Sequence, residues 1–395
     1  MPIDVTAERR RTPGCAHTAY LNHAGSSLPT AQTLDAMVAH LGAEARIGGY
    51  AAATAAQPRL DVLHRSVAGL LGAVPEEVAV TGSDTQSWAK AFWGFVLGGG
   101  IVRGQRVLVD RIVYVSHYMA ILQASRHVGF GIDVIESEPD GTLSLDALAA
   151  ELARGDVALV TATHVGTHRG SVNPVAAVGA ATAAAGVPYF LDACQSLGQR
   201  RVDVGEIGCD VLTATGRKWL RGPRGTGLLY VRSSFVDRLE PVGVDSRSAV
   251  WVDAERLELA PSALRFEEFE VPYAAQLGLA AALDHVGELG IDEIEHHVVA
   301  QAEQLRADLA AIERVSVVDG GRERSAIVTF VKDGSPPTDV VAAAAAADVT
   351  IGVSAAPYAR LDMAATGRDE VVRVSPHYVN DAGDLGRLLE VVAAC

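Results

Sequence analysis

The feature of this sequence that most constrains its fold is an alternation, between about residues 57 and 240, of short apolar runs with amphipathic stretches. Near-continuous apolar strands joined by helices are typical of a mostly parallel sheet covered on both faces. We therefore predict an α/β domain. Its predicted strands are 77–81, 106–110, 132–135, 157–161, 187–192, 210–213 and 227–231, and its predicted helices are 86–96, 118–127, 145–154 and 174–185.

The pattern changes after about residue 270. Two long helices are predicted at 272–289 and 291–312, followed by short strands at 326–331 and 371–375 and a last helix at 381–394. We predict a large domain over residues 57–270 and a small α+β domain over residues 271–395. The N-terminal segment, residues 1–56, precedes the first strand of the large domain and is expected to join the small one.

Composition excludes several classes of protein. With 395 residues, of which 49% are hydrophobic and 21% charged, the chain can bury a large core. A net charge of −15 is opposite to that of a nucleic-acid binder. No apolar run is long enough to span a bilayer, and the first residues do not resemble a secretory signal. The four cysteines lack metal-type spacing, so we expect no metal site and a cytoplasmic protein with reduced thiols.

The pair of residues that most strongly indicates chemistry is Asp192 and Lys218. Asp192 ends one apolar strand, and Lys218 follows the next in the run Thr215-Gly216-Arg217-Lys218. A lysine can hold the aldehyde of pyridoxal phosphate (PLP) as a Schiff base, and an acid can keep the pyridine nitrogen protonated. Burial and the adjacent Arg217 would help Lys218 to lose its proton near neutral pH. Alone, Lys218 would more often be a solvated loop lysine, but the pairing with Asp192 favours a PLP site.

A second segment offers groups for a phosphate. Gly82-Ser83-Asp84 lies at a predicted strand-to-helix turn, where backbone N–H groups and small side chains can bind an anion. The alternative is a plain helix cap, which Ser83 or Asp84 could provide without any ligand.

These motifs together resemble the class V aminotransferase-type PLP enzymes, a fold-type-I group that includes cysteine desulfurases, isopenicillin N epimerases and C–S lyases. The resemblance is strongest from His164 to Val231. It implies the PLP-dependent transferase fold, with catalytic roles for Lys218, Asp192 and Tyr114, whose ring would stack on the cofactor. The cofactor contacts that it implies are Gly82, Ser83, Asp84, Tyr114, Thr167, Asp192, Gln195 (on the ring hydroxyl), Thr215, Arg217 and Lys218.

The resemblance also implies substrate contacts. Arg373, in the run Val372-Arg373-Val374-Ser375-Pro376-His377, is similar to the arginine that clamps a substrate carboxylate, a task that suits a planar bidentate donor. The triplet His168-Arg169-Gly170 and the earlier Gly48-Gly49-Tyr50 are similar to hercynylcysteine sulfoxide lyases. We therefore predict substrate contacts from Arg373, His168, Arg169 and Tyr50.

The chain departs from the family's pattern at three places, one of which is the run Gly166-Thr167-His168-Arg169-Gly170 in place of the commoner Asn-containing turn that faces the cofactor. Residues 352–358 hold no cysteine, whereas familiar cysteine desulfurases carry a nucleophilic cysteine on a loop ahead of the arginine. Phe269-Glu270 replace a Gly-Thr pair whose threonine reaches the neighbouring subunit's phosphate. A homodimer is still expected, because two subunits normally complete each site in this fold.

The sequence thus predicts a PLP-dependent lyase that removes sulfur from an S-substituted cysteine or its sulfoxide by β-elimination. An epimerase, an aminotransferase and a decarboxylase of the same family remain open, and a cysteine desulfurase that uses a persulfide is disfavoured by the missing loop cysteine. A non-catalytic subunit is disfavoured by the retained Asp192, Lys218 and Arg373. A nicotinamide oxidoreductase is disfavoured because Gly98-Gly99-Gly100 lacks the third glycine of the dinucleotide fingerprint.

Overall fold

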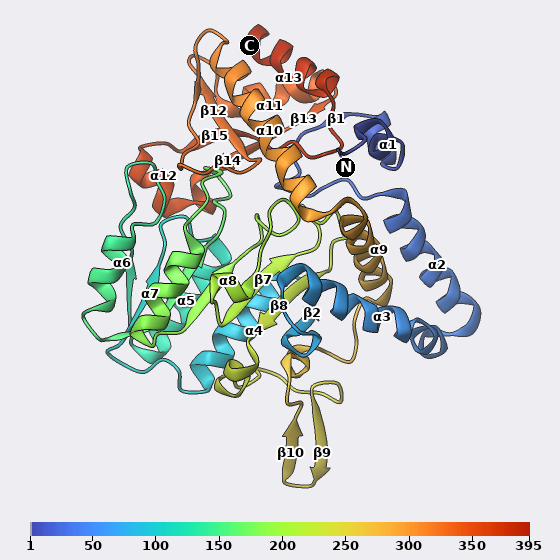
Figure 1. Ribbon diagram of the computed structural model, residues 1–395, viewed down its shortest axis with the longest axis vertical. Coiled ribbons are helices and arrows are strands. Elements are labelled where there is room, and N and C mark those ends of the chain that lie inside the picture. Colours follow the sequence, from blue (N-terminus) through green and yellow to red (C-terminus); the bar gives the residue numbers. More distant parts are fainter. Residues whose placement is uncertain (1) are drawn as a thin grey trace.

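The computed structural model describes residues 2–395 and is built around a seven-stranded sheet (Figure 1). The strand order is β2-β8-β7-β6-β5-β3-β4, and the strands are parallel except for β8, which is antiparallel to both of its neighbours. The predicted mostly parallel sheet is therefore confirmed. Its strands are β2 (Val78–Thr81), β3 (Arg106–Val109), β4 (Gly131–Val134), β5 (Val157–Thr163), β6 (Tyr189–Asp192), β7 (Val211–Thr215) and β8 (Gly227–Val231).

The sheet is buried on both faces because successive side chains of one strand enter different hydrophobic clusters. On β6, Phe190 packs with α4 and α5, whereas Leu191 belongs to a second cluster that contains residues of α6, α7 and α9. The edge strand β4 is only partly buried. The covering helices are α4 (Asp84–Leu97), α5 (Val115–Val128), α6 (Leu145–Leu152), α7 (Val175–Ala185), α8 (Val204–Ile207) and α9 (Tyr273–Leu289).

A smaller antiparallel sheet lies at the other end of the molecule, at the top of Figure 1. Its order is β11-β12-β15-β14. The N-terminal strand β1 (Ala19–Tyr20) pairs in parallel with β13 (Val349–Thr350), so the two ends of the chain meet there. The domain boundaries themselves stay a prediction. The elements of this region are β11 (Val315–Val317), β12 (Val328–Lys332), β14 (Gly352–Ala355), β15 (Glu370–Val374), α10 (Ile291–Ala310), α11 (Pro337–Ala346), α12 (Arg360–Thr366) and α13 (Ala382–Ala394).

Several elements have no counterpart in the sequence prediction, among them β11, β14, α11 and α12 of the small-sheet region and two larger parts of the fold. The long helices α2 (Ala31–Ile47) and α3 (Gly49–Leu71) pack beside α9, and the hairpin of β9 (Ala249–Asp253) and β10 (Arg256–Leu259) projects from the body (Figure 1). The remaining elements are short: α1 (Val5–Arg10) and the 3₁₀ turns η1 (Pro13–Ala16), η2 (Pro75–Glu77), η3 (Ser233–Arg238), η4 (Ala263–Phe266) and η5 (Ala356–Tyr358).

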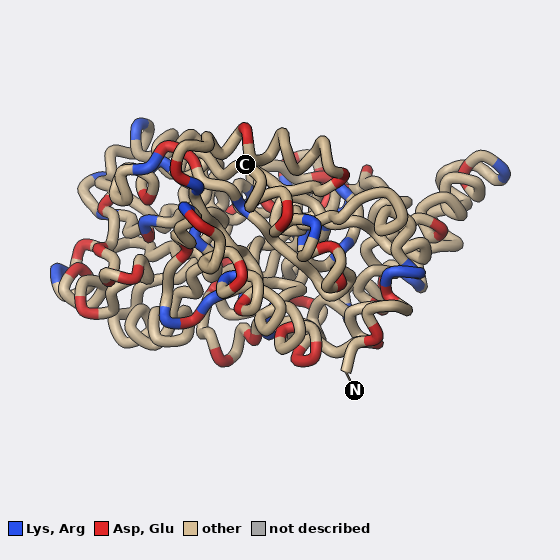
Figure 2. Tube along the Cα trace, turned by 90° about the horizontal axis from the view of Figure 1, so that it is seen from above, with Lys and Arg blue, Asp and Glu red and all other residues tan. Residues whose placement is uncertain are grey.

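The surface mixes charges of both signs. Figure 2 shows acidic and basic residues interspersed along the whole trace. Within residues 2–395, no helix combines the length and the apolar character that a membrane span requires.

Candidate active site

Lys218 lies in the turn between β7 and β8, at the edge of the sheet where the parallel strands end. The turn is tight because Gly216 sits against Thr226, where a Cβ would come within 2.3 Å of the threonine hydroxyl. Lys218 is only 7% exposed. Among residues 2–395, no hydrogen bond or ion pair engages its amine, and its Nζ lies 5.7 Å from the centroid of the Tyr114 ring.

The chain after Lys218 is held by Arg221, which has a positive φ of 60°. Its backbone N–H donates to the Lys218 carbonyl at 2.9 Å. Its buried guanidinium donates to the Leu28 carbonyl at 2.9 Å and to the Tyr378 hydroxyl at 3.0 Å. A left-handed backbone at a residue other than glycine is costly, and these bonds hold it in place. The turn that carries Lys218 is therefore anchored to both ends of the chain.

Asp192 ends β6 beside Thr163 of β5 and Thr213 of β7. It is buried, and the backbone N–H of Cys194 donates to its Oδ1 at 2.8 Å. Burial raises the pKa of Asp192 despite the attraction of His117. The structure thus brings Asp192, Lys218 and Tyr114 together at one edge of the sheet.

His117 is a buried neighbour of Asp192 to which the sequence analysis assigns no role. Its Nδ1 lies 3.5 Å from Asp192 Oδ2, and its Nε2 lies 2.9 Å from Asp84 Oδ2. Trp88 stacks on the imidazole, with ring centroids 4.1 Å apart and planes at 12°. The sequence signal for His117 is only that it follows Tyr114, the N-cap of α5, by three residues and so lies in the first turn of that helix. Nothing in this spacing points to Asp84 or Asp192.

The charges in this cluster stabilise one another. Burial opposes ionisation of His117, but the carboxylates of Asp84 and Asp192 outweigh it and raise the pKa of the imidazole. Burial also opposes ionisation of Asp84, yet His117 lowers the pKa of that carboxyl to about 2. The side chain of Asp84 is therefore directed to His117, and its predicted contact with the cofactor phosphate stays a prediction.

Gln195, Thr167 and Arg373 form one hydrogen-bonded chain. Gln195 Nε2 donates to Thr167 Oγ1 at 2.8 Å, and Arg373 donates to the carbonyl of Thr167 at 3.0 Å and to its Oγ1 at 3.2 Å. Trp219 Nε1 donates to Gln195 Oε1 at 2.9 Å, which fixes the amide. These contacts link the predicted cofactor residues to the predicted carboxylate clamp.

Arg373 has a hydrogen-bond donor that no protein group accepts among residues 2–395. Its Nε is buried without a hydrogen-bond partner, and within residues 2–395 no acidic side chain forms an ion pair with it. Burial lowers the pKa of Arg373 to about 10, and the nearby Tyr114 acts in the opposite direction. A substrate carboxylate would supply the missing acceptor.

The predicted phosphate contacts have protein partners in this structure. Thr215 Oγ1 donates to the Thr226 carbonyl at 3.2 Å, and Arg217 donates to the carbonyl of Gly25. Ser83 caps α4 by accepting the backbone N–H of Gln86 at 3.2 Å, and the N–H of Gly82 donates to the Gln86 side chain at 2.6 Å. Their contacts with a phosphate stay predictions.

Three predicted substrate residues are placed elsewhere. His168 Nε2 lies 2.9 Å from Asp362 Oδ2 of α12, and Arg169 lies 3.3 Å from the other oxygen of that carboxylate. These interactions join the loop after β5 to the small sheet region. Tyr50, at the start of α3, is 81% exposed. No contact joins these three residues to Lys218 among the residues that the structure describes, and their substrate roles remain untested.

The residues around Lys218 fit PLP. An unengaged buried lysine, an aromatic ring close to its amine and a buried carboxylate are the groups that hold this cofactor. Cys194 lies beside Asp192, and burial raises the pKa of its thiol well above the usual range, so the thiol stays protonated. Ligand atoms of Asp84, Asp192 and Cys194 lie within 4.8 Å of one another, but His117 and Lys218 already supply the positive charge there.

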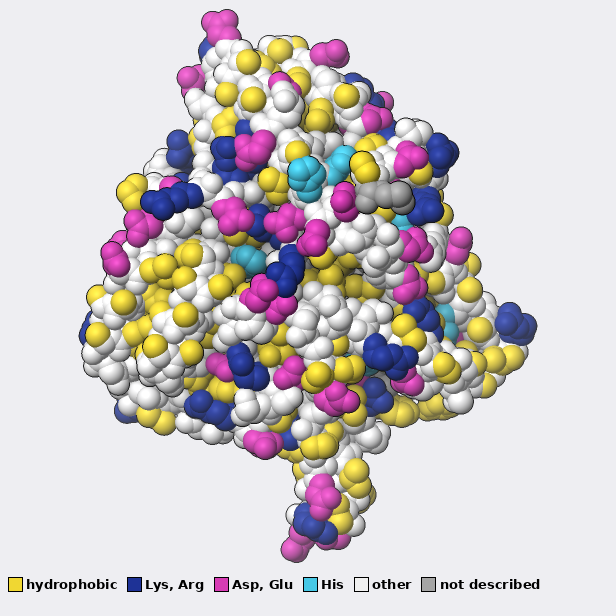
Figure 3. All heavy atoms as spheres, in the orientation of Figure 1, with side chains coloured by type: hydrophobic (Ala, Val, Ile, Leu, Met, Phe, Trp, Pro, Cys, Tyr) yellow, Lys and Arg dark blue, Asp and Glu magenta, His cyan; other side chains and the backbone are white. Residues whose placement is uncertain are grey.

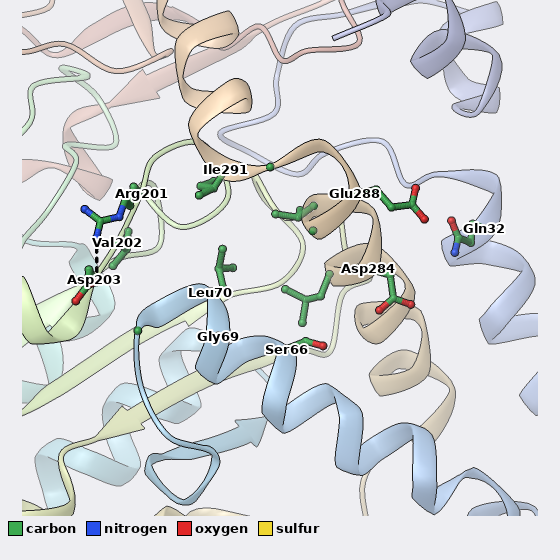
Figure 4. Close-up of a pocket in the computed structure, with 15 residues that line it drawn as sticks. Gln32, Ser66, Gly69, Leu70, Arg201, Val202, Asp203, Asp284, Glu288 and Ile291 are labelled. Carbon is green, nitrogen blue, oxygen red and sulfur yellow. Dashed lines mark hydrogen bonds and ion pairs between the residues drawn. The ribbon is translucent and has the colours of Figure 1, made fainter. Parts of the chain in front are cut away.

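A surface cavity of about 890 Å³ is separate from this site. It lies between α3 and α9, and Figure 4 shows Arg201 bonded to Asp203 on one side and Asp284 and Glu288 on the other. None of the predicted site residues lines it.

Comparisons with known proteins find relatives that match nearly the whole chain. The family model of the class V aminotransferases matches residues 19–388. A probable cysteine desulfurase of Methanothermobacter thermautotrophicus is 27% identical over 402 residues, which cover 98% of this chain and 97% of the relative. A probable hercynylcysteine sulfoxide lyase of Mycobacterium tuberculosis is 32% identical over 380 residues, which cover 95% of this chain and 89% of the relative.

Solved structures share the fold. A cysteine desulfurase from Thermococcus onnurineus superposes with a TM-score of 0.89 at 23% identity, covering 100% of this chain and 98% of the other. A cystine C–S lyase, solved with its reaction product cysteine persulfide, superposes with a TM-score of 0.86 at 22% identity, covering 97% and 99%.

Proposed function

This chain belongs to the class V aminotransferase family of PLP-dependent enzymes, and on that premise we propose that it is a C–S lyase. Its substrate would be an S-substituted cysteine or the corresponding sulfoxide. The reaction breaks the Cα–H and Cβ–S bonds, and hydrolysis of the remaining fragment gives pyruvate and ammonia. The sulfur leaves as a thiol, or as a sulfenate from the sulfoxide.

Each residue of the site would have a separate role in this reaction. When bound, PLP supplies an electron sink for the charge that develops at Cα. Lys218 would hold the cofactor and then, as a free amine, remove the Cα proton. Arg373 would bind the substrate carboxylate and so orient the Cα–H bond. Asp192 would hold negative charge beside the ring nitrogen, and Tyr114 would cover one face of the ring.

The choice of a lyase rests on one observation, which is that the segment beside Arg373 carries no cysteine thiol. Gly352 of β14 pairs with Arg373, and the turn η5 that follows β14 holds no thiol. Cys194 is the cysteine nearest the site, and its raised pKa makes it a poor nucleophile. A lyase needs no enzyme thiol, because the sulfur leaves with the electrons of the Cβ–S bond. The relative named as a probable hercynylcysteine sulfoxide lyase supports the same choice.

A second candidate is a cysteine desulfurase, which the names of several relatives favour. That reaction would leave alanine and would pass sulfur to a thiol. An epimerase, an aminotransferase or a decarboxylase would share the early steps and would differ in which bond at Cα is made or broken.

One assay separates these candidates. The PLP-loaded protein is mixed with S-substituted cysteines, their sulfoxides, cysteine and ordinary amino acids, and pyruvate, alanine and released sulfur are measured together. A lyase gives pyruvate in step with thiol or sulfenate. Alanine with protein-bound persulfide would instead establish a desulfurase. Without pyruvate, racemised amino acid would establish an epimerase, a keto acid that keeps its side chain an aminotransferase, and released carbon dioxide a decarboxylase.

We propose that the protein acts as a homodimer in the cytoplasm. Trp251 is 79% exposed on the projecting hairpin, and its cross-strand partner Leu257 is exposed on the same face. Figure 3 shows hydrophobic and charged side chains together on this hairpin. An aromatic side chain of this size on a protruding face is typical of a protein–protein contact. Its four free cysteines support a reducing location.

A further inference from the structure

A buried line of three side chains runs behind the site, from Asp84 through His117 to Asp192. Imidazole nitrogens lie 2.9 Å from Asp84 Oδ2 and 3.5 Å from Asp192 Oδ2. The three residues come from α4, α5 and β6, so the tertiary fold alone brings them together. All three are almost completely buried, which means that solvent does not screen their charges.

The charges along this line alternate in sign. Two carboxylates face opposite edges of one imidazole, and each favours its doubly protonated, cationic form. Lys218 is the basic side chain near His117. Asp110, directly after β3, is a further buried acid, and the charge of His117 acts on its carboxyl group. With Asp84 and Asp192 ionised and His117 protonated, the three residues carry one net negative charge. This single negative charge would balance the single positive charge of a protonated pyridine ring.

The line also fixes the orientation of Asp192. One oxygen accepts the backbone N–H of Cys194 at 2.8 Å, and the other faces His117. The Asp84 carboxylate in turn holds the imidazole by a hydrogen bond, and the Trp88 ring covers its face without bonding to it. A carboxylate held at both oxygens keeps its remaining lone pairs in one direction, which is how an outer residue tunes the group in front of it.

We propose that His117 and Asp84 are positioning residues that hold Asp192 ionised and oriented, so that the cofactor's ring nitrogen stays protonated during turnover. This inference rests on the proposed PLP-dependent function. Without His117, the buried Asp192 would tend to take up a proton and would lose the charge that stabilises the ring cation. Without Asp84, the buried imidazole would lose its counter-charge and become neutral, with the same consequence for Asp192.

The experiment uses two near-isosteric variants and one control. His117→Asn removes the imidazolium, and Asp84→Asn removes its counter-charge with little change in volume. Trp88→Phe alters the packing against His117 but breaks no hydrogen bond, because Trp88 Nε1 has no partner. Each protein is loaded with PLP that carries ¹⁵N in the ring. The ¹⁵N chemical shift and the visible spectrum are followed against pH, together with kcat and KM.

In both Asn variants we expect the ring nitrogen to deprotonate at a pH lower by about one unit or more, and kcat to fall roughly tenfold or more in step with it. KM should change by less than about threefold, because Arg373 is untouched. Trp88→Phe should titrate as the wild type does. A combined His117→Asn and Asp84→Asn variant should be no worse than the poorer single variant, since both act through one carboxylate.

Superimposable ¹⁵N titrations of the wild type and both Asn variants would overturn the inference, even if their stabilities differ. Loading with a PLP analogue that has carbon in place of the ring nitrogen adds a second test on the same proteins. Wild type and His117→Asn should then have equal rates, and unequal rates would also overturn it. Failure of the proposed function would give a different result. The wild-type protein would then bind no PLP, or the Lys218→Ala variant would keep the visible absorbance of the wild type.

Discussion

The amine of Lys218 is buried close to the Tyr114 ring, and among residues 2–395 no acidic side chain is bonded to it. A lysine in this position is free to form a covalent bond to a cofactor and then to carry a proton. Arg373, by contrast, is fixed by Thr167 and keeps its Nε free. In the proposed reaction, Lys218 would therefore serve the chemistry and Arg373 would serve substrate recognition.

Lys218→Ala is expected to abolish the visible absorbance of the lysine-bound cofactor and to lower kcat by at least about a hundredfold, since the proton-transfer group is lost. The measurement is a spectrum and a pyruvate assay of the PLP-loaded variant. Lys90→Ala is the matched control, because that lysine pairs with Glu268, which is not a predicted site residue. Retention of activity in Lys218→Ala would refute the assignment.

Arg373→Lys is expected to raise KM by at least about tenfold, because an ammonium cannot replace a bidentate guanidinium. Steady-state kinetics with the best substrate of the panel give the result. The exposed Arg360 provides the control as Arg360→Lys. A large loss of kcat at unchanged KM would show that Arg373 does not hold the carboxylate.

The sequence could identify the pair of Asp192 and Lys218, because the first ends and the second follows a strand whose position is set by its apolar run. His117 could not be found in this way. Its role depends on Asp84 and Asp192, which lie on other elements and meet it only through the packing of α4 and α5 on the sheet. The pairing of His168 with Asp362 of α12 was equally hidden.

At the scale of elements, Glu267 connects α3 to β2, because it forms an ion pair with His64 of α3. His64 Nε2 lies 2.6 Å from Glu267 Oε1, and the same oxygen accepts the backbone N–H of Val80 in β2 at 2.9 Å. Arg247 contacts the other oxygen of Glu267. Burial opposes ionisation of His64, but Glu267 outweighs it and raises the pKa of the imidazole.

A raised pKa in the folded state means that this contribution to stability is fully present below the unfolded pKa of about 6.5 and is lost as pH rises through the folded pKa. We expect His64→Gln to lower the free energy of unfolding by about 1–3 kcal/mol at pH 6 and by clearly less at pH 9. Urea unfolding at both pH values measures this. The exposed His127, changed to Gln, is the control, and a difference independent of pH would contradict the expectation.

The sequence pattern located the central strands to within about two residues because they are buried on both faces and read as continuous apolar runs. The same reasoning missed α2, α3 and the β9–β10 hairpin. The hairpin strands are largely exposed, and α3 contains Pro58, which is unusual inside a helix. The exposed hairpin strands carry too little of the hydrophobic period to be recognised. Helix α3 does reach the core through Leu63, Val67 and Leu71, but Pro58 interrupts its helical signal.

At the scale of the whole molecule, the hairpin extends the chain well beyond its own core (Figure 1). We expect replacement of both Trp251 and Leu257 by Ser to raise the dissociation constant of the proposed dimer at least about tenfold, since a buried aromatic anchor contributes on the order of 2 kcal/mol. Light scattering after size-exclusion chromatography measures the mass. Glu255→Gln, in the turn of the hairpin, is the control, and an unchanged dimer would exclude the hairpin from the interface.

The meeting of the two chain ends beside Lys218 has a consequence for biosynthesis. Residues 192 and 218 lie in the middle of the chain, whereas Arg373 lies on β15 and contacts Asn22 near the start. A ribosome makes the lysine and its acid long before it makes the arginine. We therefore expect the nascent chain to assemble the proposed reactive half first and to complete the proposed carboxylate clamp later, when β15 has been made and docks. A product that ended before β15 would carry Lys218 without the arginine that we propose to bind the substrate.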